Sequence, residues 1–391
     1  MSDPFAEIRP YRDEEVTGVL DRLLHDPEFL DALARLRVGN LANALPPVWR
    51  YLARMYLRRQ LRSVHTVHDM QMVVKSYMDR MIEDTTGGFS VSGLDALDPA
   101  KAYVFMSNHR DIAMDPAFTN YALHTGGHDT IRIAIGDNLL TKPWVSDVMR
   151  LNKSFIVKRS VSGPRELLAA AKTLSAYIQF SILQESAPVW IAQREGRAKD
   201  GFDKTEPAVI KMLSMSRDKS QQSFGEHIAS LNIVPVAISY ELDPCDELKA
   251  RELHERAETG AYEKAEQEDV ASIGRGIAGA KGSVHVSFGQ PLGDTFGNAV
   301  DVAAEVDRQI LKGYCLHPTN LYAYRRLHEC DPPDAAALYL EPGAISEIDF
   351  QQRIDAMAAP LRPLALAIYA NAVTQKINAA PGAQDASDPS C

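Results

Sequence analysis

The chain has 391 residues, of which 45% are hydrophobic and 24% are charged, and its formal net charge at pH 7 is −10. These values are typical of globular proteins and exclude collagen-like, coiled-coil and wholly disordered chains. The acidic balance argues against a general nucleic-acid-binding protein, because such domains are normally basic. The four cysteines include no CxxC pair, which argues against a zinc ribbon or a disulfide framework.

The first residues, MSDPFAEIRPYRDEE, are acidic where a secretory signal would be basic and then apolar. No uncharged apolar run reaches the roughly 18–20 residues that are needed to cross a bilayer. We therefore expect a protein that is soluble or lies on a membrane surface, and that does not span the membrane.

A basic amphipathic helix is predicted in the N-terminal helical region, which covers residues 1–88. Residues 32–68 contain seven arginines and no acidic residue. Pro46 and Pro47 can begin a helix, and apolar residues recur near helical spacing after them. Such a helix can lie among lipid headgroups, with Trp49, Tyr51 and Tyr56 at the interface and its arginines on anionic lipid. The alternative is that it packs against the acidic body of the same protein.

After Gly87-Gly88, short β-rich runs alternate with helical runs. The predicted strands are residues 102–106, 131–135, 154–157, 188–192, 233–239 and 283–288. This alternation predicts an α/β fold with a mostly parallel central sheet flanked by helices. We expect the α/β domain to cover residues 89–295, followed by a helical C-terminal extension over 296–378 and a disordered tail over 379–391. Helices are expected at 246–269, 300–311, 320–327, 335–340 and 345–378.

The segment from Ser107 to Pro116 carries the first candidate chemistry. It follows a predicted strand, at the edge of an α/β sheet where ligands bind. His109 could take a proton from a hydroxyl group, while Asp111 or Asp115 fixes the tautomer of its ring. The alternative is that an aspartate caps the next helix and His109 is an ordinary loop residue. A metal site is disfavoured, because no second His/Asp cluster accompanies this segment.

Two further segments place cations after predicted strands. Lys158 and Arg159 follow the strand at 154–157, and the loop at 193–201 holds Arg197 and Lys199. Guanidinium groups suit phosphate, because their planar fork matches its oxygens. A solvated strand end and an ordinary charged turn are the alternatives.

The order of these blocks resembles that of the glycerophosphate acyltransferase family. The matching positions are Asn108-His109 with Asp115, Ile156-Val157-Lys158-Arg159, Glu195-Gly196 and Val234-Pro235-Val236. The run that begins near Lys204-Thr205 resembles the segment after the third block in glycerol-3-phosphate acyltransferases. Two departures stand out: the gap from histidine to aspartate is one residue longer than in the family pattern, and arginine follows the glycine of the third block directly.

The resemblance implies that His109 is the general base and that Asp115 orients it, with Asp111 as the alternative orienting residue. It implies no metal and no bound cofactor. The sequence shows no nucleophile motif such as GxSxG that would indicate a covalent acyl-enzyme.

The resemblance also implies a phosphate-binding set. Arg159, together with Arg197 or Lys199, would hold the phosphate of the acceptor, and Glu195 with Gly196 would shape the pocket.

The implied activity is transfer of a fatty acyl group from acyl-CoA or acyl-carrier protein to a glycerophosphate hydroxyl. The favoured acceptor is 1-acylglycerol-3-phosphate, and glycerol-3-phosphate is the alternative. A non-catalytic lipid-binding protein with the same fold is a further alternative. The implied location is the cytoplasmic face of a membrane, held there by an anionic surface, and no nucleic-acid partner is expected.

Overall fold

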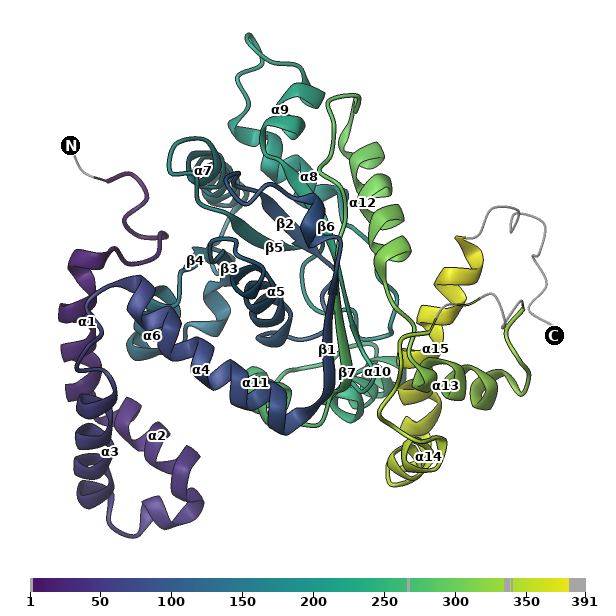
Figure 1. The fold of residues 1–391 in the computed structure, drawn as a ribbon, viewed down its shortest axis with the longest axis horizontal. Helices are drawn as coiled ribbons and strands as arrows, with labels where there is room; N and C mark the ends of the chain where they lie inside the picture. Colours follow the sequence, from purple (N-terminus) through teal and green to yellow (C-terminus); the bar gives the residue numbers. More distant parts are fainter. Residues whose placement is uncertain (1–2, 266–267, 334–337, 339, 380–391) are drawn as a thin grey trace. The chain divides into compact units, whose positions relative to one another are not determined.

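The computed structural model describes residues 3–265, 268–333, 338 and 340–379. It divides into two units that alternate along the chain (Figure 1). The first unit runs up to Met78 and resumes at Arg132–Thr173, and the second comprises Asp79–Ile131 and the chain from Leu174 onward. The expected domain boundaries at residues 88 and 295 stay predictions.

The first unit contains a helical group and one pair of strands. Its helices and strands are α1 (Asp13–His25), α2 (Pro27–Val38), α3 (Pro46–Gln60), α6 (Pro143–Leu151), β3 (Arg132–Gly136) and β4 (Ser154–Val157). Strands β3 and β4 are parallel and lie where the sequence predicts them. Helix α1 buries Val16, Val19, Leu20 and Leu23, whose spacing places them on one helical face, and they pack with Leu151 of α6.

Helix α3 begins at Pro46, as predicted, and buries none of its side chains. Arg50 forms an ion pair with Asp31 of α2 at 2.6 Å, and Arg54 donates a hydrogen bond to the carbonyl of Leu24 at 2.8 Å. This helix also carries large exposed apolar side chains, at Val48, Tyr51, Leu52, Met55 and Tyr56.

The second unit is built on five strands in the order β1–β7–β6–β2–β5. Their bounds are Thr86–Ser92 for β1, Val104–Ser107 for β2, Val189–Ala192 for β5, Ile233–Tyr240 for β6 and Gly282–Phe288 for β7. Neighbouring strands are parallel except β6 and β7. All eight residues of β6 are buried, as expected for a strand covered on both faces. The predicted mostly parallel α/β fold is confirmed.

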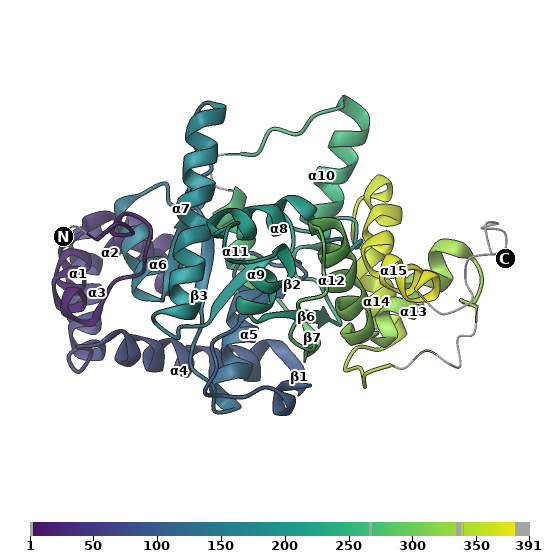
Figure 2. The same ribbon diagram turned by 90° about the horizontal axis from the view of Figure 1, so that it is seen from above.

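Helices flank these strands. They are α5 (Met114–Thr125), α8 (Pro207–Leu213), α9 (Phe224–Ser230), α10 (Asp246–Thr259), α11 (Glu268–Ala278), α12 (Ala299–Gly313), α13 (Pro318–His328), α14 (Glu347–Asp355) and α15 (Arg362–Asn378). Helix α12 packs on β6, and α13 and α14 pack against α15, where Figure 2 shows them grouped. Helices α4 (Val67–Thr85) and α7 (Pro164–Leu183) cross the boundary between the two units. Short 3₁₀ helices lie at Gly39–Asn43, Leu94–Ala96, Asp137–Leu139, Ser214–Ser216 and Ala359–Leu361.

Strand β1 was not predicted, because Gly87-Gly88 is typical of a loop that ends a helical region. Glycine is required there by packing: a Cβ added to Gly87 would lie 2.2 Å from the Cβ of Ala344. The chain then continues as a strand, and Phe89 stacks on Phe118 of α5 with ring centroids 5.4 Å apart.

Two predicted helices are each divided. The helix expected at 246–269 ends at Gly260, which adopts a left-handed conformation with φ 77°, as glycines at helix ends commonly do. The helix expected at 345–378 is α14 followed by α15, with Pro360 between them and Pro363 in the first turn of α15. Helices α12 and α13 confirm the predictions at 300–311 and 320–327. The predicted helix at 335–340 and the predicted tail at 379–391 both fall mostly outside the described residues.

None of the described helices combines the length and the apolar character that a membrane span requires.

Candidate active site

The loop after β2 is fixed by β6 on one side and by the loop after β5 on the other. The Asn108 side chain accepts a hydrogen bond from the backbone N–H of Ile238 at 2.8 Å and donates one to the Ile238 carbonyl at 3.0 Å. Its amide group thus extends the pairing between β2 and β6 by one position. On the other side, the backbone N–H of Ala198 donates to the carbonyl of His109 at 2.7 Å. His109 is therefore held at the carboxyl edge of the parallel strands.

His109 and Asp115 form a base–orienter pair. Nδ1 of His109 lies 2.9 Å from Oδ2 of Asp115. The carboxylate is fully buried in the first turn of α5, and the imidazole remains 13% exposed. Within the part of the chain that the structure describes, Nε2 has no hydrogen-bond partner. The imidazole can thus meet a substrate with one nitrogen while the carboxylate holds the other.

Three further groups fix the Asp115 carboxylate, and one ring packs against His109. Oδ2 also accepts from the backbone N–H groups of Arg110 and Asp111, at 2.6 and 2.9 Å. Oδ1 accepts from the Tyr240 hydroxyl at 2.8 Å. Burial, together with the charge of Asp115, raises the pKa of Tyr240 well above its usual value, so the phenol keeps its proton. The Trp190 ring meets that of His109 edge to face.

Asp111 binds backbone groups at the start of α5. Its Oδ1 accepts from the backbone N–H groups of Ala113 and Met114, both at 2.9 Å, so it caps the start of α5. Burial and the neighbouring charge of Asp115 raise the pKa of Asp111. Among the described contacts, no hydrogen bond joins Asp111 to His109. Of the two carboxylates considered from the sequence, the structure pairs Asp115 with the imidazole.

A buried ion pair lies beneath this loop, and the sequence did not predict it. Arg110 forms an ion pair with Asp203 at 2.7 Å and donates to the Gly201 carbonyl at 2.9 Å. Asn108 donates to the same Asp203 oxygen at 3.2 Å. Gln375 of α15 accepts from the backbone N–H of Asp203 at 2.9 Å, so the C-terminal extension supports the loop. Tyr240 was also missed, although it follows directly after a predicted strand at the same sheet edge.

The basic loop after β5 separates its two cations. Arg197 is 9% exposed, and its Nη2 lies 3.4 Å from the Ser272 hydroxyl. Its Nη1 is buried and has no partner among the described residues. Lys199 forms an ion pair with Glu252, which also pairs with Arg256, and burial lowers the pKa of Lys199. Arg197 therefore has a free donor, whereas the charge of Lys199 is already neutralised.

Glu195 and Gly196 lie at the exposed turn of this loop. Gly196 has φ +72°, and a Cβ at this position would meet nothing within 4 Å. Its backbone conformation, rather than crowding, favours glycine.

Arg159 lies in the first unit, directly after Lys158 and β4. Its backbone N–H donates to Asp137 Oδ1 at 3.0 Å, and its side chain is exposed. Its predicted role as a phosphate ligand stays a prediction.

Comparisons with known proteins give a family match for part of the chain. Residues 88–239 match the family model described as Acyltransferase. Among solved structures, the chain is similar to the 1-acyl-sn-glycerophosphate (LPA) acyltransferase PlsC from Thermotoga maritima. The identity is 14%, the match covers 63% of this chain and 79% of that chain, and the TM-score is 0.35. A search of the curated proteins found no significant match. The match to the Acyltransferase family model over residues 88–239 supports the acyltransferase family recognised from the sequence.

Proposed function

We propose that this enzyme transfers a fatty acyl group from acyl-CoA or acyl-carrier protein to a hydroxyl of a glycerophosphate, with 1-acylglycerol-3-phosphate as the acceptor. The observation that carries the proposal is the 2.9 Å contact between His109 Nδ1 and Asp115 Oδ2, which leaves Nε2 open to a substrate hydroxyl.

In this mechanism, Nε2 of His109 takes the proton of the acceptor hydroxyl as its oxygen attacks the thioester carbonyl. Asp115 stabilises the imidazolium that forms. The tetrahedral intermediate collapses, its C–S bond breaks, and the imidazolium returns the proton to the leaving sulfur. The products are an ester and a free thiol, and the imidazole ends neutral.

The acceptor phosphate would be held by cations from the sequence blocks that resemble those of the acyltransferase family. Arg197 is favoured over Lys199, because its Nη1 lacks a protein partner among the described residues while Lys199 pairs with Glu252. Arg159 is the second proposed ligand. Glu195 and Gly196 would shape the turn that faces the phosphate.

The test measures thiol release and product mass with a panel of donors and acceptors. We expect the parent enzyme to acylate 1-acylglycerol-3-phosphate and His109→Ala to release no thiol above background. If glycerol-3-phosphate is the only acceptor that gives product, it replaces 1-acylglycerol-3-phosphate as the acceptor in this proposal. Absence of product with every pair would refute the proposal and favour the non-catalytic lipid-binding alternative.

We also propose that α3 places the enzyme on the cytoplasmic face of a membrane. Its exposed apolar side chains, such as Tyr51, Leu52 and Met55, stand beside the exposed arginines Arg58 and Arg59. Each such cation contributes about 1 kcal/mol near an anionic leaflet. The ion pair of Arg50 with Asp31 shows that part of the basic face instead packs within the protein, as in the alternative stated from the sequence.

Sedimentation with anionic vesicles tests this placement. Leu52→Asp should reduce the fraction of enzyme that pellets. The matched control is Leu167→Asp, because Leu167 is 47% exposed and Leu52 is 46% exposed. Equal pelleting of the two variants, or pelleting that is absent in the parent at low salt, would refute the placement.

A further inference from the structure

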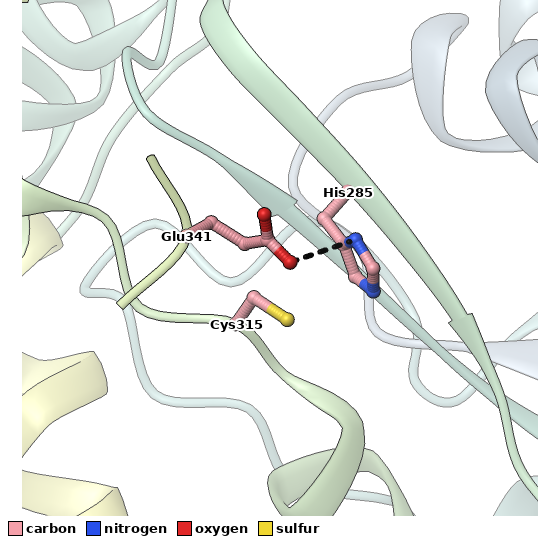
Figure 3. Close-up of side chains that lie close together, drawn as sticks. All are labelled: His285, Cys315 and Glu341. Carbon is pink, nitrogen blue, oxygen red and sulfur yellow. Dashed lines mark ion pairs between the residues drawn. The ribbon is translucent and has the colours of Figure 1, made fainter. Parts of the chain in front are cut away.

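A second cluster of reactive side chains lies in the second unit, on elements other than the His109 loop. It consists of His285 on β7, Cys315 after α12 and Glu341 before α14. Figure 3 shows the three side chains pointing toward one another. Nδ1 of His285 lies 3.5 Å from Oε1 of Glu341, and one potential ligand atom from each residue lies within 4.8 Å of the others.

His285 is held in an orientation suited to a ligand. Its two ring nitrogens meet serine hydroxyls of β1: Nδ1 lies 2.7 Å from Ser90 Oγ, and Nε2 lies 2.9 Å from Ser92 Oγ. Burial lowers the pKa of His285, so the ring is neutral and carries one N–H. When Nε2–H donates to Ser92, Nδ1 accepts from the Ser90 hydroxyl, and an ion bound to Nδ1 beside Glu341 would take the place of that hydroxyl. A hydrogen bond from the far nitrogen is the usual support of a metal-binding histidine.

The backbone holds the other two residues side by side. Leu316 and Leu340 form a parallel bridge, and the N–H of Glu341 donates to the carbonyl of Leu316 at 2.8 Å. Cys315 and Glu341 are therefore fixed next to each other by main-chain pairing. Burial raises the pKa of the Cys315 thiol to about 11, so the thiol is no nucleophile by itself, and a bound cation would displace its proton.

The distances suit a small tetrahedral ion. Bonds of about 2.0–2.3 Å place neighbouring ligands of tetrahedral zinc roughly 3.3–3.8 Å apart. The 3.5 Å separation of His285 and Glu341 lies in that range, and the ligand atom of Cys315 lies within 4.8 Å of both. Imidazole, thiolate and carboxylate together suit zinc, whereas magnesium and calcium take oxygen ligands.

We propose that His285, Cys315 and Glu341 bind a zinc ion, with water in the fourth position, and that this ion ties β7 to the segments that lead into α13 and α14. We expected no metal from the sequence, because the three residues lie far apart along the chain and form no motif. Lys376 is the cationic neighbour of Cys315; burial lowers its pKa, and its amino group donates to the Lys312 carbonyl at 3.1 Å.

The test uses the full-length protein, stripped of metal and kept reduced, and titrated with Zn²⁺ and with Co²⁺. We expect one equivalent of each to bind, and the Co²⁺ form to show sulfur-to-cobalt charge-transfer absorption. Cys315→Ser should abolish that absorption and weaken Zn²⁺ binding by about tenfold or more, since even supporting residues change affinity by that factor. Glu341→Gln, at a partly exposed position, should also weaken binding.

Cys245→Ser is the control, because Cys245 is the other free cysteine among the described residues and should leave the absorption intact. Absence of stoichiometric binding in the parent, or an unchanged cobalt spectrum in Cys315→Ser, would overturn the proposal. These measurements need no acyl donor or acceptor, so they are independent of the proposed acyl transfer.

Discussion

Tyr240→Phe tests whether the environment of Asp115, as well as its identity, supports catalysis. The substitution removes the hydroxyl that donates to Oδ1 of Asp115 at 2.8 Å and keeps the buried ring. The carboxylate would still accept from His109 and from two backbone N–H groups. It would therefore stay near His109, with one buried oxygen lacking its partner.

The expected magnitude follows from that single hydrogen bond. A hydrogen bond to a charged group contributes about 1.5–3 kcal/mol, and each 1.4 kcal/mol or so changes a rate about tenfold. We expect kcat to fall about 10- to 100-fold. The KM for the acceptor should stay within about twofold, because Tyr240 acts on His109 through Asp115 and does not hold substrate.

The assay is steady-state thiol release, with the melting temperature measured in parallel. Tyr314→Phe is the matched control: Tyr314 is also buried, and its ring lies over Arg110 at 5.5 Å, a contact that phenylalanine retains. In a His109→Ala background, Tyr240→Phe should have no further effect on rate. A kcat within twofold of the parent, or an equal loss in Tyr314→Phe, would refute the reasoning.

Three further predictions concern phosphate binding, packing and acid stability. Arg197→Gln should raise the KM for the acceptor about tenfold or more, because a charged hydrogen bond is lost. Lys199→Gln should raise this KM less. Equal increases of KM for the two variants in initial-rate assays would contradict the prediction. Gly276→Ala should lower the melting temperature, because the new Cβ would lie 2.3 Å from the carboxylate that caps α5, at a cost of about 1–3 kcal/mol. Gly274→Ala, on the same helix with nothing within 4 Å, should not lower it. Burial lowers the pKa of His317 from 6.5 to about 4. As the pH drops from 6.5 to about 4, the unfolded chain therefore binds a proton at this residue before the folded chain does, and the free energy of unfolding falls. His317→Gln should reduce that loss by about 2–3 kcal/mol in urea titrations, and an unchanged pH profile would count against it.

The strands of the sheet could be predicted because buried parallel strands are short, continuous apolar runs. Strand β4 begins and ends where the sequence places it, at Ser154 and Val157. Strand β1 was missed, because Gly87-Gly88 favours a loop when only the local sequence is considered, and the close approach of Ala344 that requires glycine at position 87 comes from a distant segment. Long-range packing of this kind leaves no local pattern in the sequence.

The candidate site could likewise be predicted only where its residues are close together in the sequence. His109 and Asp115 could be proposed together because they are close in sequence and belong to one block. Tyr240 and Asp203 reach that block from distant segments, so spacing along the chain does not reveal them. Their side chains meet the loop only because β6 and the loop after β5 end at the same edge of the sheet.

The central claim is that His109, oriented by Asp115, removes the proton from the acceptor hydroxyl. The most direct test compares kcat for Asp115→Asn and Asp111→Asn in the purified enzyme, with 1-acylglycerol-3-phosphate and acyl-CoA. We predict that Asp115→Asn lowers kcat on the order of 10³- to 10⁴-fold, as loss of an orienting carboxylate does in a catalytic triad. Asp111→Asn, which alters only the cap of α5, should lower it far less. Equal rates in the two variants, or a larger loss in Asp111→Asn, would contradict the claim.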